Sequence, residues 1–211
     1  MNLQALDTAL TELPLVAILR GITPAEIDGA LESLVTAGFR MIEVPLNSPD
    51  PFVSIQRLVE RAPDDVVVGA GTVLDTTAVK RLADIGAPLV VTPNLDHEVL
   101  DATQQHGLGA LVGCYTPSEM FAALKGGARA VKLFPAAAAG TGYLKDITSV
   151  LPKGTRVMAV GGVALDGMEQ WVAAGIGGFG YGGYLYKPGT DPDILGQRAS
   201  ALVKRWRELH A

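Results

Sequence analysis

Short apolar runs alternate with longer amphipathic stretches along the whole chain, and this alternation is the main structural signal in the sequence. Runs this short, rich in valine, isoleucine and leucine, are typical of strands that are buried on both faces of a parallel sheet. They predict eight strands, at residues 15–19, 41–46, 66–72, 89–92, 110–112, 130–134, 157–160 and 178–185.

Helix start signals lie between these strands. Several consist of a capping residue followed by proline or an acidic residue, which favour the first turn of a helix. The signals occur at 23–26, 48–50, 75–78, 96–98, 116–119 and from 166 onward. Glycine-containing turns close several of the helices, and they recur about every 20 to 25 residues, as expected of repeated βα units.

Eight such units favour a closed (β/α)₈ TIM barrel. An open, doubly wound sheet is the alternative, but it does not explain why polar residues gather at so many strand ends. We expect residues 1–211 to form one barrel domain, with an N-terminal helix at about 2–12 and a C-terminal helix at about 191–210.

Composition narrows the class of protein further. The chain has 211 residues, a net charge of −5 and one notable basic cluster, at 204–207 on the terminal helix, so we expect no nucleic-acid or membrane partner. No apolar run reaches the roughly 18 residues of a membrane span, and the first residues lack the basic start of a signal peptide. A single cysteine, Cys114, fits a reducing compartment, so a cytoplasmic protein is expected.

Two ionisable residues interrupt otherwise apolar strands. Lys132 lies in Ala-Val-Lys-Leu-Phe-Pro (130–135) and Glu43 in Met-Ile-Glu-Val-Pro-Leu (41–46). Burial lowers the pKa of an amine, and a neutral amine can form a Schiff base with a carbonyl while a nearby carboxylate moves protons. A buried ion pair between the two, or a lysine that reaches solvent, is the structural alternative.

Further candidates follow the other strands. Arg20 follows the first strand and suits a carboxylate ligand, because its planar guanidinium can donate two parallel hydrogen bonds. Gly161-Gly162 and Gly182-Gly183 lie at the ends of the seventh and eighth strands, where barrel enzymes often bind phosphate. The three histidines avoid the strand ends and no metal-binding spacing occurs, so neither a metal nor another cofactor is expected.

Several of these segments resemble one known family, the class I aldolases that act on 2-dehydro-3-deoxy-6-phospho sugar acids. The resemblance covers residue 13 to the last helix and is carried by Leu-Pro-Leu-Val-Ala-Ile-Leu-Arg-Gly-Ile (13–22), Ile-Glu-Val-Pro-Leu-Asn-Ser-Pro (42–49), Gly-Ala-Gly-Thr-Val-Leu (69–74), Val-Thr-Pro-Asn (91–94), Val-Lys-Leu-Phe-Pro-Ala (131–136) and Ala-Val-Gly-Gly-Val (159–163). Asn47, where gluconate-type relatives have arginine, and Val160, where they tend to have threonine, favour the galactonate branch.

The resemblance implies reversible cleavage to pyruvate and D-glyceraldehyde 3-phosphate, with Lys132 as the Schiff-base lysine and Glu43 as the general acid and base. It implies that Arg20 and Thr72 bind the pyruvoyl carboxylate, that Pro93 and Phe134 shape the pocket, and that the two glycine pairs bind phosphate. It also implies a homotrimer. Gly183 and Ala137 depart from the pattern, since relatives often carry serine there.

Other functions remain open on the sequence alone. The same chemistry could act on the gluconate epimer at C4. An epimerase or isomerase that uses paired acids, or a phosphosugar-binding barrel without catalysis, would use the same fold.

Overall fold

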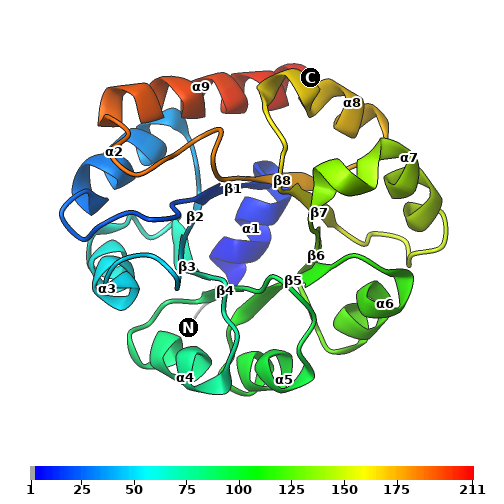
Figure 1. Ribbon diagram of the computed structural model, residues 1–211, viewed down its shortest axis with the longest axis horizontal. Helices are drawn as coiled ribbons and strands as arrows, with labels where there is room; N and C mark the ends of the chain where they lie inside the picture. The colour runs from blue at the N-terminus through cyan, green and yellow to red at the C-terminus, as the bar shows by residue number, and fades with distance from the viewer. Residues whose placement is uncertain (1–2) are drawn as a thin grey trace.

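The computed structural model describes residues 3–211, and a closed barrel of parallel strands forms its centre (Figure 1). Each strand pairs in parallel with the next one in the chain, and the last pairs with the first, so the predicted TIM barrel is confirmed. The strands are β1 (Leu15–Ile18), β2 (Met41–Pro45), β3 (Val67–Gly71), β4 (Leu89–Val91), β5 (Gly109–Cys114), β6 (Ala130–Leu133), β7 (Val157–Val160) and β8 (Gly178–Tyr181).

Helices surround this barrel and cover one of its ends. They are α1 (Gln4–Glu12), α2 (Ile27–Ala37), α3 (Pro51–Arg61), α4 (Thr76–Asp84), α5 (His97–Gln105), α6 (Pro117–Lys125), α7 (Ala136–Thr148), the 3₁₀ helix η1 (Leu165–Gly167), α8 (Met168–Ala173) and α9 (Pro192–Glu208). Within residues 3–211, no helix has the length and apolarity needed to cross a bilayer.

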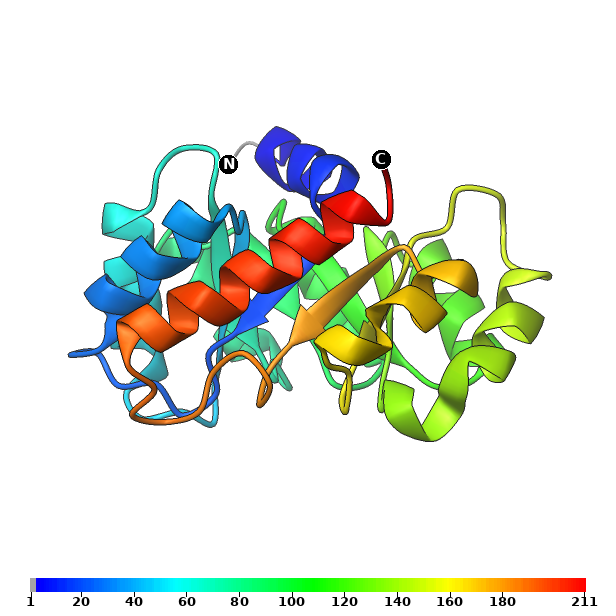
Figure 2. The same cartoon turned by 90° about the horizontal axis from the view of Figure 1, so that it is seen from above.

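The strand residues divide into two cores because side chains alternate between the two sides of a strand. One core fills the barrel interior and the other lies between the barrel and its helices. Leu6 and Leu10 of α1 belong to the interior core. Figure 2 shows α1 lying across one end of the barrel, with the arrow of β8 pointing away from it. The opposite end, where the strands terminate, is therefore the open mouth.

Several predicted helix starts have the expected caps. Asp75 and Asp96 each accept a hydrogen bond from a backbone N–H in the first turn, and Thr116 forms a capping box with Glu119. By contrast, Asp166 does not cap α8: it lies within η1, and Gly167 occupies the capping position.

The predicted end of the eighth strand was wrong. The eighth strand ends at Tyr181 rather than at 185, because the Gly182 carbonyl accepts hydrogen bonds from Leu185 and Tyr186 and turns the chain. The first helix begins at Gln4, and residue 2 of its predicted span lies outside the described residues. At the other end of the chain, α9 spans Pro192–Glu208.

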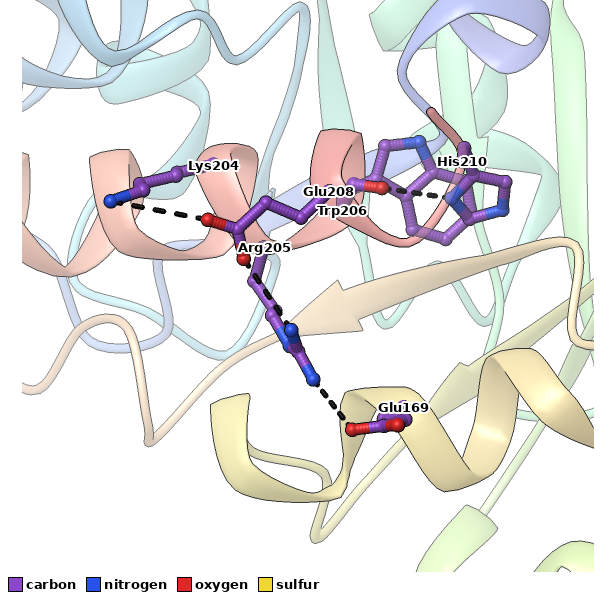
Figure 3. Close-up of polar contacts among 6 residues, drawn as sticks. All are labelled: Glu169, Lys204, Arg205, Trp206, Glu208 and His210. Atoms are coloured by element: carbon purple, nitrogen blue, oxygen red, sulfur yellow. Dashed lines mark hydrogen bonds and ion pairs between the residues drawn. The ribbon is translucent and has the colours of Figure 1, made fainter.

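The terminal helix α9 closes the ring beside α2 and α8 (Figure 1). Figure 3 shows how its last turns are held: Arg205 bridges to Glu169 of α8 at 2.6 Å, and the ring of His210 stacks on Trp206 with centroids 3.9 Å apart. The ion pair lies at the surface, where such pairs contribute little, so the buried Trp206 side chain is the stronger anchor.

Candidate active site

Lys132 is buried near the end of β6, with 8% of its surface exposed. Its Nζ donates a 2.9 Å hydrogen bond to the Thr92 carbonyl and lies 4.8 Å from the centroid of the Phe134 ring. Burial lowers the pKa of the Lys132 amine; the negative charge of Glu43 opposes this shift and the Arg20 guanidinium adds to it. A lowered pKa increases the fraction of neutral, nucleophilic amine.

Glu43 lies on β2, and only 3% of its surface is exposed. One of its oxygens, Oε2, has no hydrogen-bond partner among the described residues. Burial raises the pKa of this carboxyl to about 7, and the positive charges of Lys132 and Arg20 only partly oppose the rise. A carboxyl with a pKa near neutral can both accept and return a proton at physiological pH.

The two side chains face one interior space at the mouth of the barrel. Lys132 and Glu43 both line it, together with Ile18, Val160 and Gly180. None of the ion pairs within residues 3–211 joins the lysine to the glutamate. The structure therefore places a buried amine near a carboxyl that can carry a proton. The two groups do not form the buried ion pair that was the alternative interpretation of the sequence.

A larger cavity of about 550 Å³ adjoins this space and shares Ile18, Val160 and Gly180 with it. Its volume falls within the usual range for small-molecule sites. The cavity brings together seven of the predicted binding residues, namely Arg20, Phe134, Val160, Gly161, Gly162, Gly182 and Gly183, and also contains Tyr184 and Lys187.

Glycine is required at the β7 end of this cavity. Gly161 and Gly162 have φ angles of 94° and 73°, in the left-handed region that side chains disfavour. A Cβ atom on Gly162 would also lie 2.5 Å from the Cβ of Ala137. The backbone is therefore exposed to the cavity where a phosphate could approach its N–H groups.

The other predicted residues lie around the mouth. Arg20 donates a 2.7 Å hydrogen bond from Nη1 to Oδ1 of Asn47, which orients the guanidinium above β1 and β2. Thr72 follows β3 with a φ of 54°, a strained conformation for a β-branched residue. Thr72 and Pro93 follow their strands at the same end of the barrel but do not line the 550 Å³ cavity.

Sequence reasoning gave no role to two residues that hold Lys132 and Glu43 in place. Thr92 is buried; its hydroxyl accepts from the Gly113 N–H at 3.1 Å and donates to the Asn94 carbonyl at 2.7 Å, which fixes the carbonyl that binds Lys132. Gly71 leaves the space that the Glu43 carboxylate fills, since a Cβ there would lie 1.8 Å from Oε2. A buried threonine at a strand end was the available signal for Thr92, whereas the sequence held no specific signal for Gly71.

The described residues were also compared with the requirements of a metal site. The described residues contain no cluster of three or more histidine, cysteine, aspartate and glutamate side chains that could bind an ion. Cys114 is buried at the end of β5, and burial raises the pKa of its thiol to about 12, so it is a poor nucleophile or ligand.

We expect Glu43→Gln to change how stability depends on pH. The pKa of Glu43 rises from 4.5 to about 7 on folding, so the folded protein binds this proton more tightly than the unfolded chain. That contribution is fully present below pH 4.5 and is lost as the pH rises through about 7. Urea unfolding between pH 4.5 and 7.5 should show the wild type losing stability relative to Glu43→Gln. Parallel curves for the two proteins would contradict the raised pKa.

Comparison with known proteins agrees with this geometry. Residues 6–192 match the family model described as KDPG and KHG aldolase. The chain is 44% identical to the 2-dehydro-3-deoxy-6-phosphogalactonate aldolase of Escherichia coli (strain K12), over 94% of this chain and 97% of that protein. It is 45% identical to a probable aldolase of the same name from Rhizobium meliloti (strain 1021), over 91% of each chain.

A solved structure described as native KDPGal superposes with a TM-score of 0.93 at 44% identity, covering 95% of this chain and 97% of that chain. Fold and sequence thus point to the same group of enzymes, and the buried lysine and carboxyl lie where a barrel enzyme places its catalytic groups. The chain therefore belongs to the KDPG and KHG aldolase family, and it is a carbon–carbon lyase.

Proposed function

We propose that this aldolase reversibly cleaves 2-dehydro-3-deoxy-6-phosphogalactonate to pyruvate and D-glyceraldehyde 3-phosphate through a Schiff base on Lys132. The observation that carries this proposal is the buried Lys132 amine, held 2.9 Å from the Thr92 carbonyl beside the unpartnered carboxylate oxygen of Glu43. The names of the two aldolases that are 44–45% identical support the galactonate substrate.

The reaction begins when the neutral Lys132 amine attacks the C2 carbonyl of the substrate. The hydroxyl of the resulting carbinolamine, which carries the former carbonyl oxygen, takes up a proton from solvent and leaves as water, which gives an iminium ion. The iminium nitrogen carries a positive charge near Glu43, so the ionised carboxylate also stabilises this intermediate.

Carbon–carbon cleavage follows from the position of Glu43. Its carboxylate takes the proton of the C4 hydroxyl, the C3–C4 bond breaks, and the electron pair of that bond moves into the iminium to form an enamine. D-Glyceraldehyde 3-phosphate leaves. Glu43 then returns the proton to C3, and water hydrolyses the iminium to release pyruvate and free Lys132.

The remaining residues are proposed to hold the two ends of the substrate. Arg20 and Thr72 bind the carboxylate, while the backbone of the glycine pairs 161–162 and 182–183 binds the phosphate. Phe134 and Pro93 shape the pocket. Asn47 and Val160 contribute to the choice of substrate epimer, with Asn47 acting through its hydrogen bond to Arg20.

Borohydride trapping tests the mechanism. The protein is incubated with pyruvate and sodium borohydride, its intact mass is measured, and peptide mapping locates the adduct. We expect one reduced adduct, on Lys132. No adduct would overturn the Schiff-base mechanism and favour the epimerase or binding-barrel alternatives.

Substrate choice needs a separate assay with both C4 epimers. We expect a higher kcat/KM for the galactonate form than for 2-dehydro-3-deoxy-6-phosphogluconate. The reverse order would leave the mechanism intact and reassign the substrate to the gluconate epimer.

The assembly and location proposed for this enzyme are a homotrimer in the cytoplasm, without a nucleic-acid or membrane partner. The family resemblance supports the trimer, and the single buried cysteine is consistent with a reducing compartment. Sedimentation equilibrium would test the trimer; a monomer or dimer at micromolar concentration would contradict it.

A further inference from the structure

Two loops from opposite ends of the sequence meet at one side of the cavity. Strands β1 and β8 pair with each other, so the segment after β8 passes beside the segment that leads from β1 into α2 (Figure 1). Arg20 lines the cavity from the first segment, and Lys187 lines it from the second. The relative position of these two cations therefore depends on how the loops are joined.

The carboxylate of Glu26, just before α2, joins them. Its Oε2 accepts hydrogen bonds from its own loop, from the backbone N–H of Thr23 at 2.9 Å and from the Thr23 hydroxyl at 2.6 Å. Its Oε1 accepts from the other loop, from the Tyr186 hydroxyl at 2.9 Å and from the backbone N–H of Gly189 at 3.2 Å. One carboxylate thus bridges the two segments.

Burial tends to raise the pKa of Glu26, but the hydrogen bonds from Thr23, Tyr186 and Gly189 outweigh that effect and leave the pKa below its usual value. The group is therefore ionised at neutral pH, and hydrogen bonds to an ionised acceptor are stronger than those to a neutral one. Tyr186 is itself 98% buried, with a relative exposure of 2%, so the bridge is shielded from water on that side.

Lys187 lies between the two points that Glu26 holds. Its backbone is further fixed by Thr190, whose hydroxyl accepts from the Lys187 N–H at 2.9 Å and donates to the Lys187 carbonyl at 2.7 Å. Pro188 packs on Gly21 so closely that a Cβ on Gly21 would lie 2.7 Å from the proline Cγ. The Lys187 side chain is exposed, and it takes part in no ion pair within residues 3–211.

We propose that Glu26 and Tyr186 are positioning residues that hold the Lys187 ammonium at the cavity, where it binds the phosphate of the substrate and sets the preference for phosphorylated over unphosphorylated aldehydes. This inference rests on the proposed function. A phosphate dianion presented to an unpaired ammonium and to backbone N–H groups gains charge-assisted hydrogen bonds that an unphosphorylated aldehyde lacks. Holding the loop in place reduces the cost of ordering it when the ligand binds.

The test runs the reaction in the direction of synthesis. Pyruvate is combined with either D-glyceraldehyde 3-phosphate or D-glyceraldehyde, and kcat and KM are measured for each aldehyde. Tyr186→Phe removes only the hydroxyl that reaches Glu26, so the KM for the phosphorylated aldehyde should rise about five- to tenfold, with kcat nearly unchanged. Kinetics with D-glyceraldehyde should stay within about twofold of the wild type. Glu26→Gln serves as a second variant with the same expected pattern.

A matched control removes a hydrogen bond from the same carboxylate without touching the second loop. Thr23→Val loses the hydroxyl bond to Oε2 but keeps both contacts on Oε1, so the preference for the phosphorylated aldehyde should not change. Lys187→Met should lower that preference directly, by at least as much as Tyr186→Phe does. If the bridge acts through Lys187, Tyr186→Phe should cause no further loss in the Lys187→Met background.

Three results would overturn the inference: equal losses for both aldehydes, a full additional loss in the double variant, or an unchanged preference in Tyr186→Phe and Glu26→Gln. Borohydride trapping with pyruvate on the same proteins separates this failure from that of the proposed function. A wild type that forms the adduct but whose variants keep their preference rejects only the positioning role, whereas a wild type without an adduct rejects the Schiff-base mechanism itself.

Discussion

Lys132→Met is expected to lower kcat for the cleavage reaction by roughly 10⁴-fold or more, the scale seen when a covalent nucleophile is removed from an enzyme. Methionine has a similar length but cannot form an imine. The described structure offers no substitute nearby, because Lys132 is the lysine that lines the interior space with Glu43. Steady-state cleavage assays, with borohydride trapping on the same protein, would measure both the lost rate and the lost adduct.

The control for this variant is Lys153→Met. Lys153 is an exposed lysine in the connection from α7 to β7, at the end of the barrel opposite the mouth. It should keep wild-type kcat and the full adduct. Cleavage by Lys132→Met within about tenfold of the wild type would mean that the reaction does not pass through an imine on this residue.

The sequence predicted the architecture well because a parallel barrel leaves a regular pattern. Its strands are buried on both sides, so each appears in the sequence as an apolar run, and four helices (α4, α5, α6 and α9) begin with side chains that cap them locally. The errors lie where contacts formed in the folded chain determine the end of a strand or the start of a helix. The eighth strand stops early because the chain turns on the Gly182 carbonyl, and Asp166 lies in a 3₁₀ turn instead of capping α8.

The candidate site was predictable to the extent that its residues break a local pattern. Lys132 and Glu43 are conspicuous because each places a charge in an apolar strand, and the glycine pairs because they follow the last two strands. Residues whose role depends on contacts with distant parts of the sequence do not break a local pattern. Thr92 accepts a hydrogen bond from Lys132, which is 40 residues away in the sequence, and Glu26 accepts one from Gly189, which is 163 residues away. Neither role can be recognised without the fold.

Gly71→Ala is expected to reduce cleavage by about 10²- to 10⁴-fold, the range for loss of a general acid or base, although the residue carries no reactive group. Its added Cβ would lie 1.8 Å from Oε2 and 2.4 Å from Oε1 of Glu43, so the carboxylate must leave its present position. The three atoms nearest to that Cβ all belong to Glu43 and none to Lys132, which lies on β6, so trapping of pyruvate by borohydride should persist. Cleavage kinetics and adduct formation measured on one preparation would separate the two steps.

The matched control is Gly142→Ala, at an exposed glycine of α7 whose added Cβ would meet no atom within 4 Å. Alanine favours a helix over glycine by about 1 kcal/mol, so this variant should be as stable as the wild type or more so, with unchanged kinetics. If Gly71→Ala kept full cleavage activity, Glu43 would have to transfer protons from a displaced position. The contact between Glu43 on β2 and Gly71 on β3 would then not be required for proton transfer. If the variant instead lost cleavage and trapping together while remaining folded by circular dichroism, the substitution would have disturbed the lysine as well. We expect Gly71→Ala to lose cleavage but to retain trapping. That result would assign proton transfer to the Glu43 carboxylate in the position that it occupies beside Gly71.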